Sequence, residues 1–151
     1  MLAGDALQAL AFELLAPEGA AVPEPVQARL CRLLARAAGA QGMAGGQAID
    51  LAHVGCGMTE DALRHMHRLK TGALLQGSVM MGAACGAITP AATQALLTYG
   101  AALGLAFQVH DDVLDVIGDT SKLGKKAGAD AEHDKATYPA IMGLDAARAF
   151  A

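Results

Sequence analysis

Three aspartates gather near the end of a long uncharged stretch, as Asp111, Asp112 and Asp115. Spacings of three and four residues put their carboxylates on neighbouring parts of one helix face, with Gln108 one turn earlier. The carboxylates repel each other and face the negative end of the helix dipole, so their grouping indicates a cation. Clustered carboxylate oxygens suit Mg²⁺, which keeps coordination positions for water and phosphate. The pattern therefore predicts a Mg²⁺ site, and a solvated acidic helix end is the plainer alternative.

A basic cluster lies upstream, formed by His65, His67, Arg68 and Lys70. A lysine at the edge of a buried helix needs an anionic partner or a path for its ammonium to reach water. A diphosphate bridged by Mg²⁺ to the aspartates would be such a partner. For His65 and His67 we expect ordinary exposed positions, because polar histidines on a solvated helix face are common.

Two other metal sites fit the sequence poorly. A zinc site from His65, His67, Cys56 and Cys85 would have unsuitable spacing. A di-iron carboxylate bundle needs Glu-x-x-His pairs on two helices, which this sequence lacks. The three cysteines, which also include Cys31, form no C-x-x-C motif, and we expect them to be small buried residues in a reducing compartment.

The segment 119–136 mixes lysines with aspartates and glycines, and we expect a loop of functional length. Lysines on a glycine-containing loop beside metal-binding carboxylates can close over a phosphate. Charge balance in a solvent loop is the alternative explanation. The lysines concerned are Lys122, Lys125, Lys126 and Lys135.

Composition limits the class of protein that positions these groups. The chain has 151 residues, a net charge of −4, 54% hydrophobic and 17% charged residues, which predicts one ordered domain or part of a larger one. The acidic balance argues against nucleic acid or anionic membrane as the main partner. The many Ala and Gly residues favour packed helices over sheets.

No basic region followed by an apolar run opens the chain, so we expect no signal peptide and a cytoplasmic location. The uncharged stretch Thr71–Val109 raises the alternative of two membrane spans. Recurring Gln, Ser and Thr residues make it too polar for that, and we expect two helices buried on all sides and no membrane span.

Caps and breakers divide the chain into helices. Thr59, Thr89 and Thr137 are typical N-caps, and proline follows closely after two of them. We find no convincing strand, repeat or low-complexity segment, and predict an all-α protein. The predicted helices cover residues 2–16, 25–38, about 46–51, 59–85 and 90–117, and a last one runs from 137 to the end.

Three segments, in order along the chain, resemble the trans-prenyl diphosphate synthase (polyprenyl synthetase) family. Residues 107–119, read with 123–125 and 135–139, resemble the second aspartate-rich motif of that family. Residues 66–74 resemble its Lys-Thr segment, and residues 2–13 resemble the helix that follows its first aspartate-rich motif. Within the family the resemblance is to the bacterial farnesyl diphosphate synthases (geranyltranstransferases).

The resemblance implies a helical bundle of the isoprenoid synthase type and head-to-tail condensation of isopentenyl diphosphate with an allylic diphosphate, geranyl to farnesyl diphosphate, in isoprenoid biosynthesis. It implies that the aspartates bind Mg²⁺ that bridges the allylic diphosphate, which lysines also contact. Thr71 and Gln108 would line the reacting end and Phe107 the isopentenyl site. The residues implied are Lys70, Thr71 and Gln108 as catalytic; Phe107, Lys125 and Lys135 as substrate-binding; and Asp111, Asp112 and Asp115 as metal ligands.

The 151 residues contain no first aspartate-rich motif, so the resemblance assigns residues 1–151 to the C-terminal part of a prenyl synthase domain, with an incomplete bundle. We therefore expect the isolated chain to be catalytically inactive. Because helices made to be buried would lack neighbours, we also expect a homo-oligomer, in the family a homodimer. A non-catalytic partner subunit of a synthase and a terpene cyclase-like protein remain the alternatives.

Overall fold

The computed structural model describes residues 2–19, 21–118 and 136–151. All regular structure in those ranges is helical, which confirms the all-α prediction. The described helices are α1 (Leu2–Leu15), α2 (Glu24–Ala38), α3 (Met43–Ala52), α4 (Glu60–His67), the π-helical turn η1 (Arg68–Gly72), α5 (Ala73–Ala84), α6 (Pro90–Ile117), α9 (Tyr138–Met142) and α10 (Leu144–Phe150). Among them, no helix is both long enough and apolar enough to cross a membrane.

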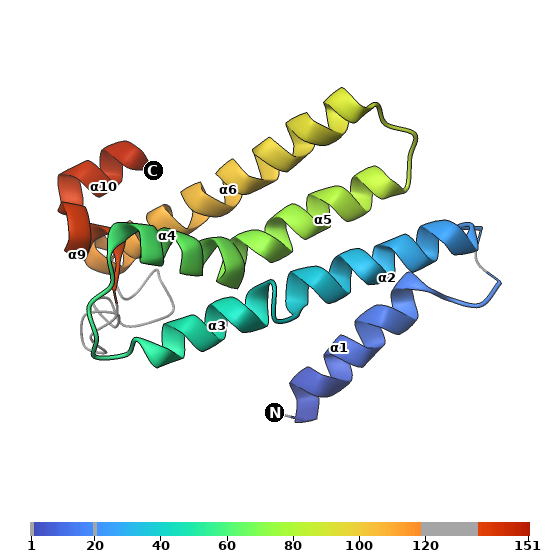
Figure 1. Cartoon of the computed structure of the whole chain (residues 1–151), viewed down its shortest axis with the longest axis horizontal. Helices are drawn as coiled ribbons and strands as arrows, with labels where there is room; N and C mark the ends of the chain where they lie inside the picture. Colours follow the sequence, from blue (N-terminus) through green and yellow to red (C-terminus); the bar gives the residue numbers. More distant parts are fainter. Residues whose placement is uncertain (1, 20, 119–135) are drawn as a thin grey trace.

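The helices form an open stack. Figure 1 shows α2 and α3 in one row, α4, η1 and α5 in the next, and α6 beyond them. Helix α1 contacts α2 on the outer side of the first row, and α9 and α10 close one end of α6. The row order places η1 between α3 and α6, which both contact it.

The predicted caps are confirmed at three helix starts. The hydroxyl oxygens of Thr59, Thr89 and Thr137 each accept a hydrogen bond from the backbone N–H three residues later in the chain. The donor–acceptor distances are 3.3, 3.1 and 3.3 Å. Each satisfies one N–H that has no partner inside its helix. The beginnings of α4, α6 and α9 are thus encoded locally.

Two predicted helices are interrupted. The helix expected over 59–85 contains the π turn Arg68–Gly72, which no proline or cap in the sequence indicates. The helix expected from Thr137 to the end breaks at Gly143, whose φ of +85° lies in a region that side-chain-bearing residues rarely adopt. That break lets α10 turn back onto α6.

The apolar core lies at the end of the stack where α4, α6, α9 and α10 meet. Leu63, Val109 and Tyr138 are fully buried there. Around them pack the buried Met66, Val113 and Ala147. This core fixes the C-terminal half of α6 against α4, directly beside the residues that the sequence marked for chemistry.

Burial elsewhere differs from the sequence expectation. Of the uncharged stretch, α5 packs against α2 and α6, but one face of α6 is uncovered. Tyr99 and Phe107 on that face are 57% and 55% exposed, so the expectation of burial on all sides is wrong. The helices lack neighbours on that side within the described residues. The expectation of buried cysteines is also wrong, because Cys56 and Cys85 are exposed and Cys31 is half-buried.

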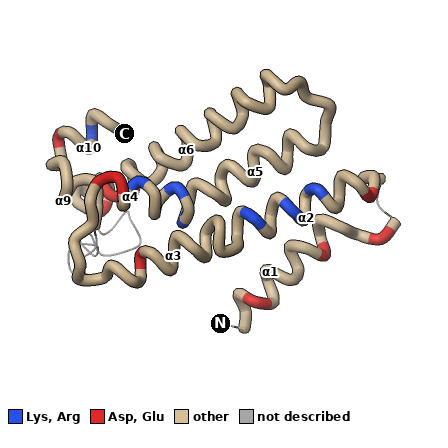
Figure 2. Tube along the Cα trace, in the orientation of Figure 1, with Lys and Arg blue, Asp and Glu red and all other residues tan. Residues whose placement is uncertain are grey.

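One face of α2 is basic and solvated. Arg29, Arg32 and Arg36 are all exposed. Figure 2 shows these basic positions along α2 and further ones around α4, while α5 and most of α6 carry no charge. The charged positions of α4 and η1 therefore come just before the uncharged helix α5 and lie beside the middle and the C-terminal half of α6.

Candidate active site

A cavity of about 280 Å³ lies between η1, α3 and the C-terminal half of α6. Helix α6 contributes Gln108, Asp111 and Asp112, and η1 contributes Lys70 and Thr71. The structure thus brings together five of the residues that the sequence singled out, from positions about 40 residues apart along the chain. The other lining residues are Asp50, Met66, His67, Ala136 and Thr137.

Lys70 has the anionic partner that its position required, but the partner is a residue the sequence analysis missed. Its Nζ donates to Oδ2 of Asp50 on α3 at 2.6 Å. Both side chains are largely shielded, with 29% and 14% exposed, so the attraction is less screened than in a surface pair. Asp50 is the sole acid between Glu24 and Glu60, in a stretch rich in Gly and Ala, and that isolation was the available signal.

Asp112 is anchored by the start of α9, 26 residues further along the chain. Its Oδ2 accepts a hydrogen bond from the backbone N–H of Tyr138 at 2.9 Å, and the side chain is 5% exposed. A charge-assisted bond of this kind is stronger than a neutral one. Asp112 therefore links the end of α6 to the start of α9.

The three aspartates do not share one environment. Asp111 is half-buried and lines the cavity with Asp112, whereas Asp115 is 2% exposed and lies outside the cavity lining. In the part of the chain that the structure describes, no three acidic, histidine or cysteine side chains are grouped closely enough to hold a metal on their own.

The three residues predicted to bind substrate are not part of the described cavity. Phe107 is exposed on the outer face of α6, since it stands one residue, about 100° of helix rotation, before Gln108. It is not part of the cavity lining. Lys125 and Lys135, with the rest of 119–135, lie outside the described residues.

His67 corrects a prediction. We expected exposed histidines, and His65 is exposed, but His67 is buried at 6% exposure and lines the cavity. Its ring packs against the Tyr138 ring with centroids 5.5 Å apart. Tertiary packing of α9 against α4 covers this side chain, and helix periodicity alone does not reveal it.

Tyr138 lies directly behind two residues that line the cavity, since it follows Thr137 in the chain and its ring packs on His67. It is fully buried, and its hydroxyl has no hydrogen-bond partner among the described residues. Burial raises the pKa of this phenol above its ordinary value; the Arg64 charge opposes that rise and the Asp112 charge adds to it. The ring of Phe150 lies 5.9 Å beyond, and the Arg64 guanidinium stacks on that ring at 5.2 Å.

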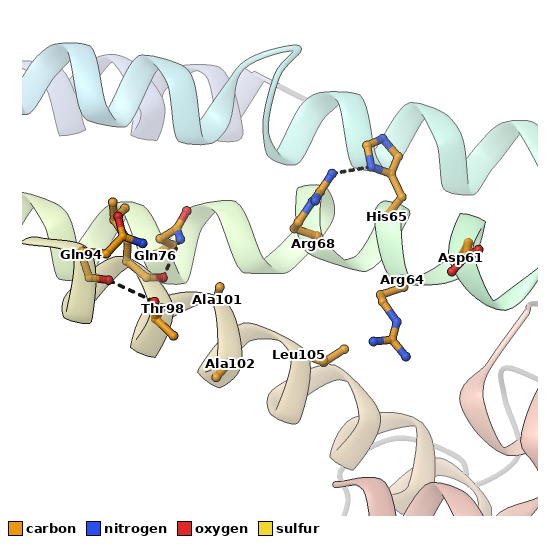
Figure 3. A pocket seen from close by; sticks show the side chains of 11 residues that line it. Asp61, Arg64, His65, Arg68, Gln76, Gln94, Thr98, Ala101, Ala102 and Leu105 are labelled. Carbon is orange, nitrogen blue, oxygen red and sulfur yellow. Dashed lines mark hydrogen bonds between the residues drawn. The ribbon is translucent and has the colours of Figure 1, made fainter.

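A larger hollow of about 780 Å³ lies between α4–α5 and α6 (Figure 3). Its polar groups bind one another. Arg64 pairs with Glu60 at 2.7 Å, Arg68 bonds to His65 at 2.8 Å, and Gln76 donates to the carbonyl of Leu97. The bond to Glu60 is also the main reason that the pKa of Arg64 is raised. The smaller cavity is the better candidate because three carboxylates, of Asp50, Asp111 and Asp112, and the Lys70 ammonium border it.

Known proteins are similar to this chain along nearly its whole length. Residues 1–150 match the family model described as polyprenyl synthetase. The chain is 48% identical over 153 residues to farnesyl diphosphate synthase from Escherichia coli (strain K12), covering 98% of this chain and 50% of that enzyme. It is 50% identical over 155 residues to a probable farnesyl diphosphate synthase from Bradyrhizobium diazoefficiens, covering all of this chain and 46% of that protein.

A solved structure is similar as well. The geranyltransferase of Helicobacter pylori, complexed with magnesium and isoprenyl diphosphate, superposes with a TM-score of 0.88 at 31% identity, covering 99% of this chain and 48% of that one. The chain thus spans about half the length of the relatives it matches. With a family model matched along almost its whole length, and the Lys70 and aspartate segments meeting at one cavity, the chain belongs to the polyprenyl synthetase family.

Proposed function

We propose that this chain is the diphosphate-binding part of a prenyl diphosphate synthase that condenses isopentenyl diphosphate with an allylic diphosphate, geranyl to farnesyl diphosphate. The observation that carries the proposal is the single cavity bordered by Lys70 on one side and by Asp111 and Asp112 on the other. A diphosphate ester, which is multiply negatively charged, suits an ammonium on one side and a carboxylate-held cation on the other. Relatives named farnesyl diphosphate synthase support the reaction.

The donor set fits Mg²⁺. Mg²⁺ is commonly held by one or two carboxylates together with substrate phosphates and water, so two aspartates at an open cavity suffice without a complete protein cage. Asp111 and Asp112 would hold it. Asp115, one turn further along but buried outside the cavity lining, would be a third ligand on the family resemblance alone. When bound, Mg²⁺ would neutralise charge on the departing diphosphate.

The chain's own residues would act on the rest of the substrate. Lys70 would donate hydrogen bonds to diphosphate oxygens, sharing its ammonium between the ligand and Asp50. Thr71 and Gln108 line the cavity, and their neutral oxygen atoms would face the positive charge that develops as the diphosphate leaves. The roles of Phe107, Lys125 and Lys135 rest on the family resemblance alone.

Calorimetric titration of the 151-residue chain with inorganic diphosphate tests the binding proposal. We expect binding only when Mg²⁺ is present, and loss of it in Asp111→Asn and in Lys70→Gln. Exposed Asp61→Asn on α4, which lies outside this cavity, is the matched control and should bind as the parent does. The absence of Mg²⁺-dependent binding would instead favour a non-catalytic partner subunit with a relic motif.

We propose further that residues 1–151 are the C-terminal part of a prenyl synthase domain. The half-length match to the relatives and the single aspartate-rich motif support this. The purified 151 residues should then form no farnesyl diphosphate from geranyl and isopentenyl diphosphates, and a measurable rate would contradict the proposal.

We also propose a homo-oligomer with α1 in the contact, and a cytoplasmic location. No residue of α1 is buried, and Leu2, Leu7 and Leu14 are 85%, 65% and 68% exposed. An apolar helix face of this kind is typical of an interface. A monomer in light scattering at micromolar concentration would exclude the oligomer.

The proposed cytoplasmic location is supported by the three free cysteines, which suit a reducing compartment.

A further inference from the structure

The π turn η1 carries both Lys70 and Thr71, yet its own sequence does not specify it. A π turn holds one more residue than an α turn, so it changes the direction of the side chains within it, and such turns are frequent at functional sites. Arg68–Gly72 contains no proline, and no side-chain cap stabilises its start. Its geometry must therefore depend on what packs around it.

Two glycines on the flanking helices touch the backbone of η1. A Cβ atom at Gly46 of α3 would lie 2.5 Å from Cα of Lys70 and closer still to the Lys70 amide nitrogen. A Cβ atom at Gly104 of α6 would lie 2.7 Å from Cα of Gly72. Real Cβ atoms essentially never come within 3.0 Å of other heavy atoms, so any side chain at either position must push the backbones apart.

The close contact of Gly46 with η1 and the ion pair between Asp50 and Lys70 are formed by the same face of α3. Gly46 and Asp50 are four residues apart on α3 and so lie on one helix face. Gly46 brings α3 onto the backbone of Lys70, and Asp50 then reaches its ammonium at 2.6 Å. Separating α3 from η1 at Gly46 would move both Asp50 and Lys70 relative to Asp111.

We infer that Gly46 and Gly104 are positioning residues, which clamp η1 from two sides and set the distance between Lys70 and the aspartates of α6. The inference rests on the proposed function for its consequence, diphosphate binding, while the clamp itself is a property of the fold. Neither glycine lines the cavity, so each acts through the backbone of η1.

The chain offers two matched controls. Gly77 of α5 is packed about as closely as Gly104, since its Cβ would lie 2.8 Å from the Cβ of Ala37, but that contact is between α5 and α2. At Gly82 of α5, an added methyl group would have no heavy atom of a neighbouring element within 4 Å. Gly77→Ala therefore disturbs packing away from η1, and Gly82→Ala tests the bare substitution in a helix.

The experiment compares Gly46→Ala, Gly104→Ala, Gly77→Ala and Gly82→Ala in the full chain. Titration with Mg²⁺ and inorganic diphosphate should show affinity about tenfold weaker for the first two, because displacements near 1 Å are costly to positioned groups. Gly77→Ala should keep the parent affinity although its unfolding temperature falls, and Gly82→Ala should match the parent or be slightly more stable. Unchanged affinity in both clamp variants, or an equal loss in Gly77→Ala, would overturn the inference.

Amide hydrogen exchange separates a failed clamp from a failed function. Exchange at residues 68–72 should accelerate in Gly46→Ala and Gly104→Ala and stay at the parent rate in Gly77→Ala. If the parent chain binds no diphosphate, the proposed function fails, and this exchange pattern alone decides the clamp. If Gly46→Ala does not fold, Gly104→Ala, with the longer contact, decides it in the same assays.

Discussion

Helices α1 and α6 are both apolar, yet the structure treats them differently. Among the described helices, α1 makes substantial contact with α2 alone, and it buries none of its residues. The C-terminal half of α6 is held by α4, η1, α9 and α10 and buries Gln108, Val109, Asp112, Val113 and Asp115. Composition is thus a poor guide to burial; the number of neighbouring elements decides it, and the polar residues of α6 are buried where apolar leucines of α1 are not.

The comparison also separates two uses of apolar surface. At the α6 end it encloses a core that holds charged groups in fixed places. On α1 it is presented outward, together with the exposed face of α6 that carries Tyr99, Leu103 and Phe107. The first arrangement favours chemistry, and the second favours association.

The largest expected effect contrasts one leucine from each region. Leu63→Ala opens a cavity in the core and should lower the free energy of unfolding by about 2–5 kcal/mol. Leu7→Ala, at 65% exposure, should change it by less than about 0.5 kcal/mol in the monomer. Urea denaturation at low protein concentration measures the unfolding free energy of both variants. Similar losses in the two would contradict the claim that the core at α6 is packed and α1 is not.

If α1 forms the contact between copies of the chain, changing its apolar face should weaken the concentration-dependent association of the chain. The double variant Leu7→Asp with Leu14→Asp places charges on the exposed apolar face and should shift the oligomer to monomer in light scattering, by tenfold or more in dissociation constant. Arg29→Asp on the solvated face of α2 is a charge-changing control and should leave association unchanged. If the double variant associates as the parent does, α1 is not the contact.

A smaller effect is expected where α4 begins. Thr59→Ala removes the hydroxyl that accepts the Ala62 N–H and should cost about 1 kcal/mol of unfolding free energy. Helix α4 carries Leu63 and His67, so the loss should reach the core and the cavity. Thr59→Ser retains the cap and should restore stability; failure to do so would show that the methyl group matters instead.

The smallest effect concerns pH. The pKa of Tyr138 is raised in the folded chain, so above about pH 10 the unfolded phenol ionises first and draws the equilibrium toward unfolding. Stability should therefore fall more steeply with alkaline pH in the parent than in Tyr138→Phe, and the two should be alike at pH 7. Thermal melts without Mg²⁺ from pH 8 to 11 measure the difference, and parallel curves would contradict it.

Much of the fold followed from local chemistry. The starts at Thr59, Thr89 and Thr137 were predictable because a side-chain cap depends on residues within one turn. The extent of α6 was predictable because Pro90 and Gly118 bound a long stretch that contains no further proline and is uncharged as far as Val109. The interruptions at η1 and Gly143 were not, because one depends on packing and the other on a backbone angle that glycine permits without requiring.

The sequence by itself determined which chemical groups are available and which helices carry them: an ammonium at Lys70 and carboxylates at Asp111 and Asp112. Only the tertiary structure decided that Asp50 pairs with Lys70, that His67 is buried, and that Asp115 and Phe107 do not line the cavity. The physical reason is the distance along the chain over which each interaction acts. Caps and helix faces are set by neighbours a few residues away, whereas pairing and burial depend on helix backbones that meet through packing across 20 residues or more of chain.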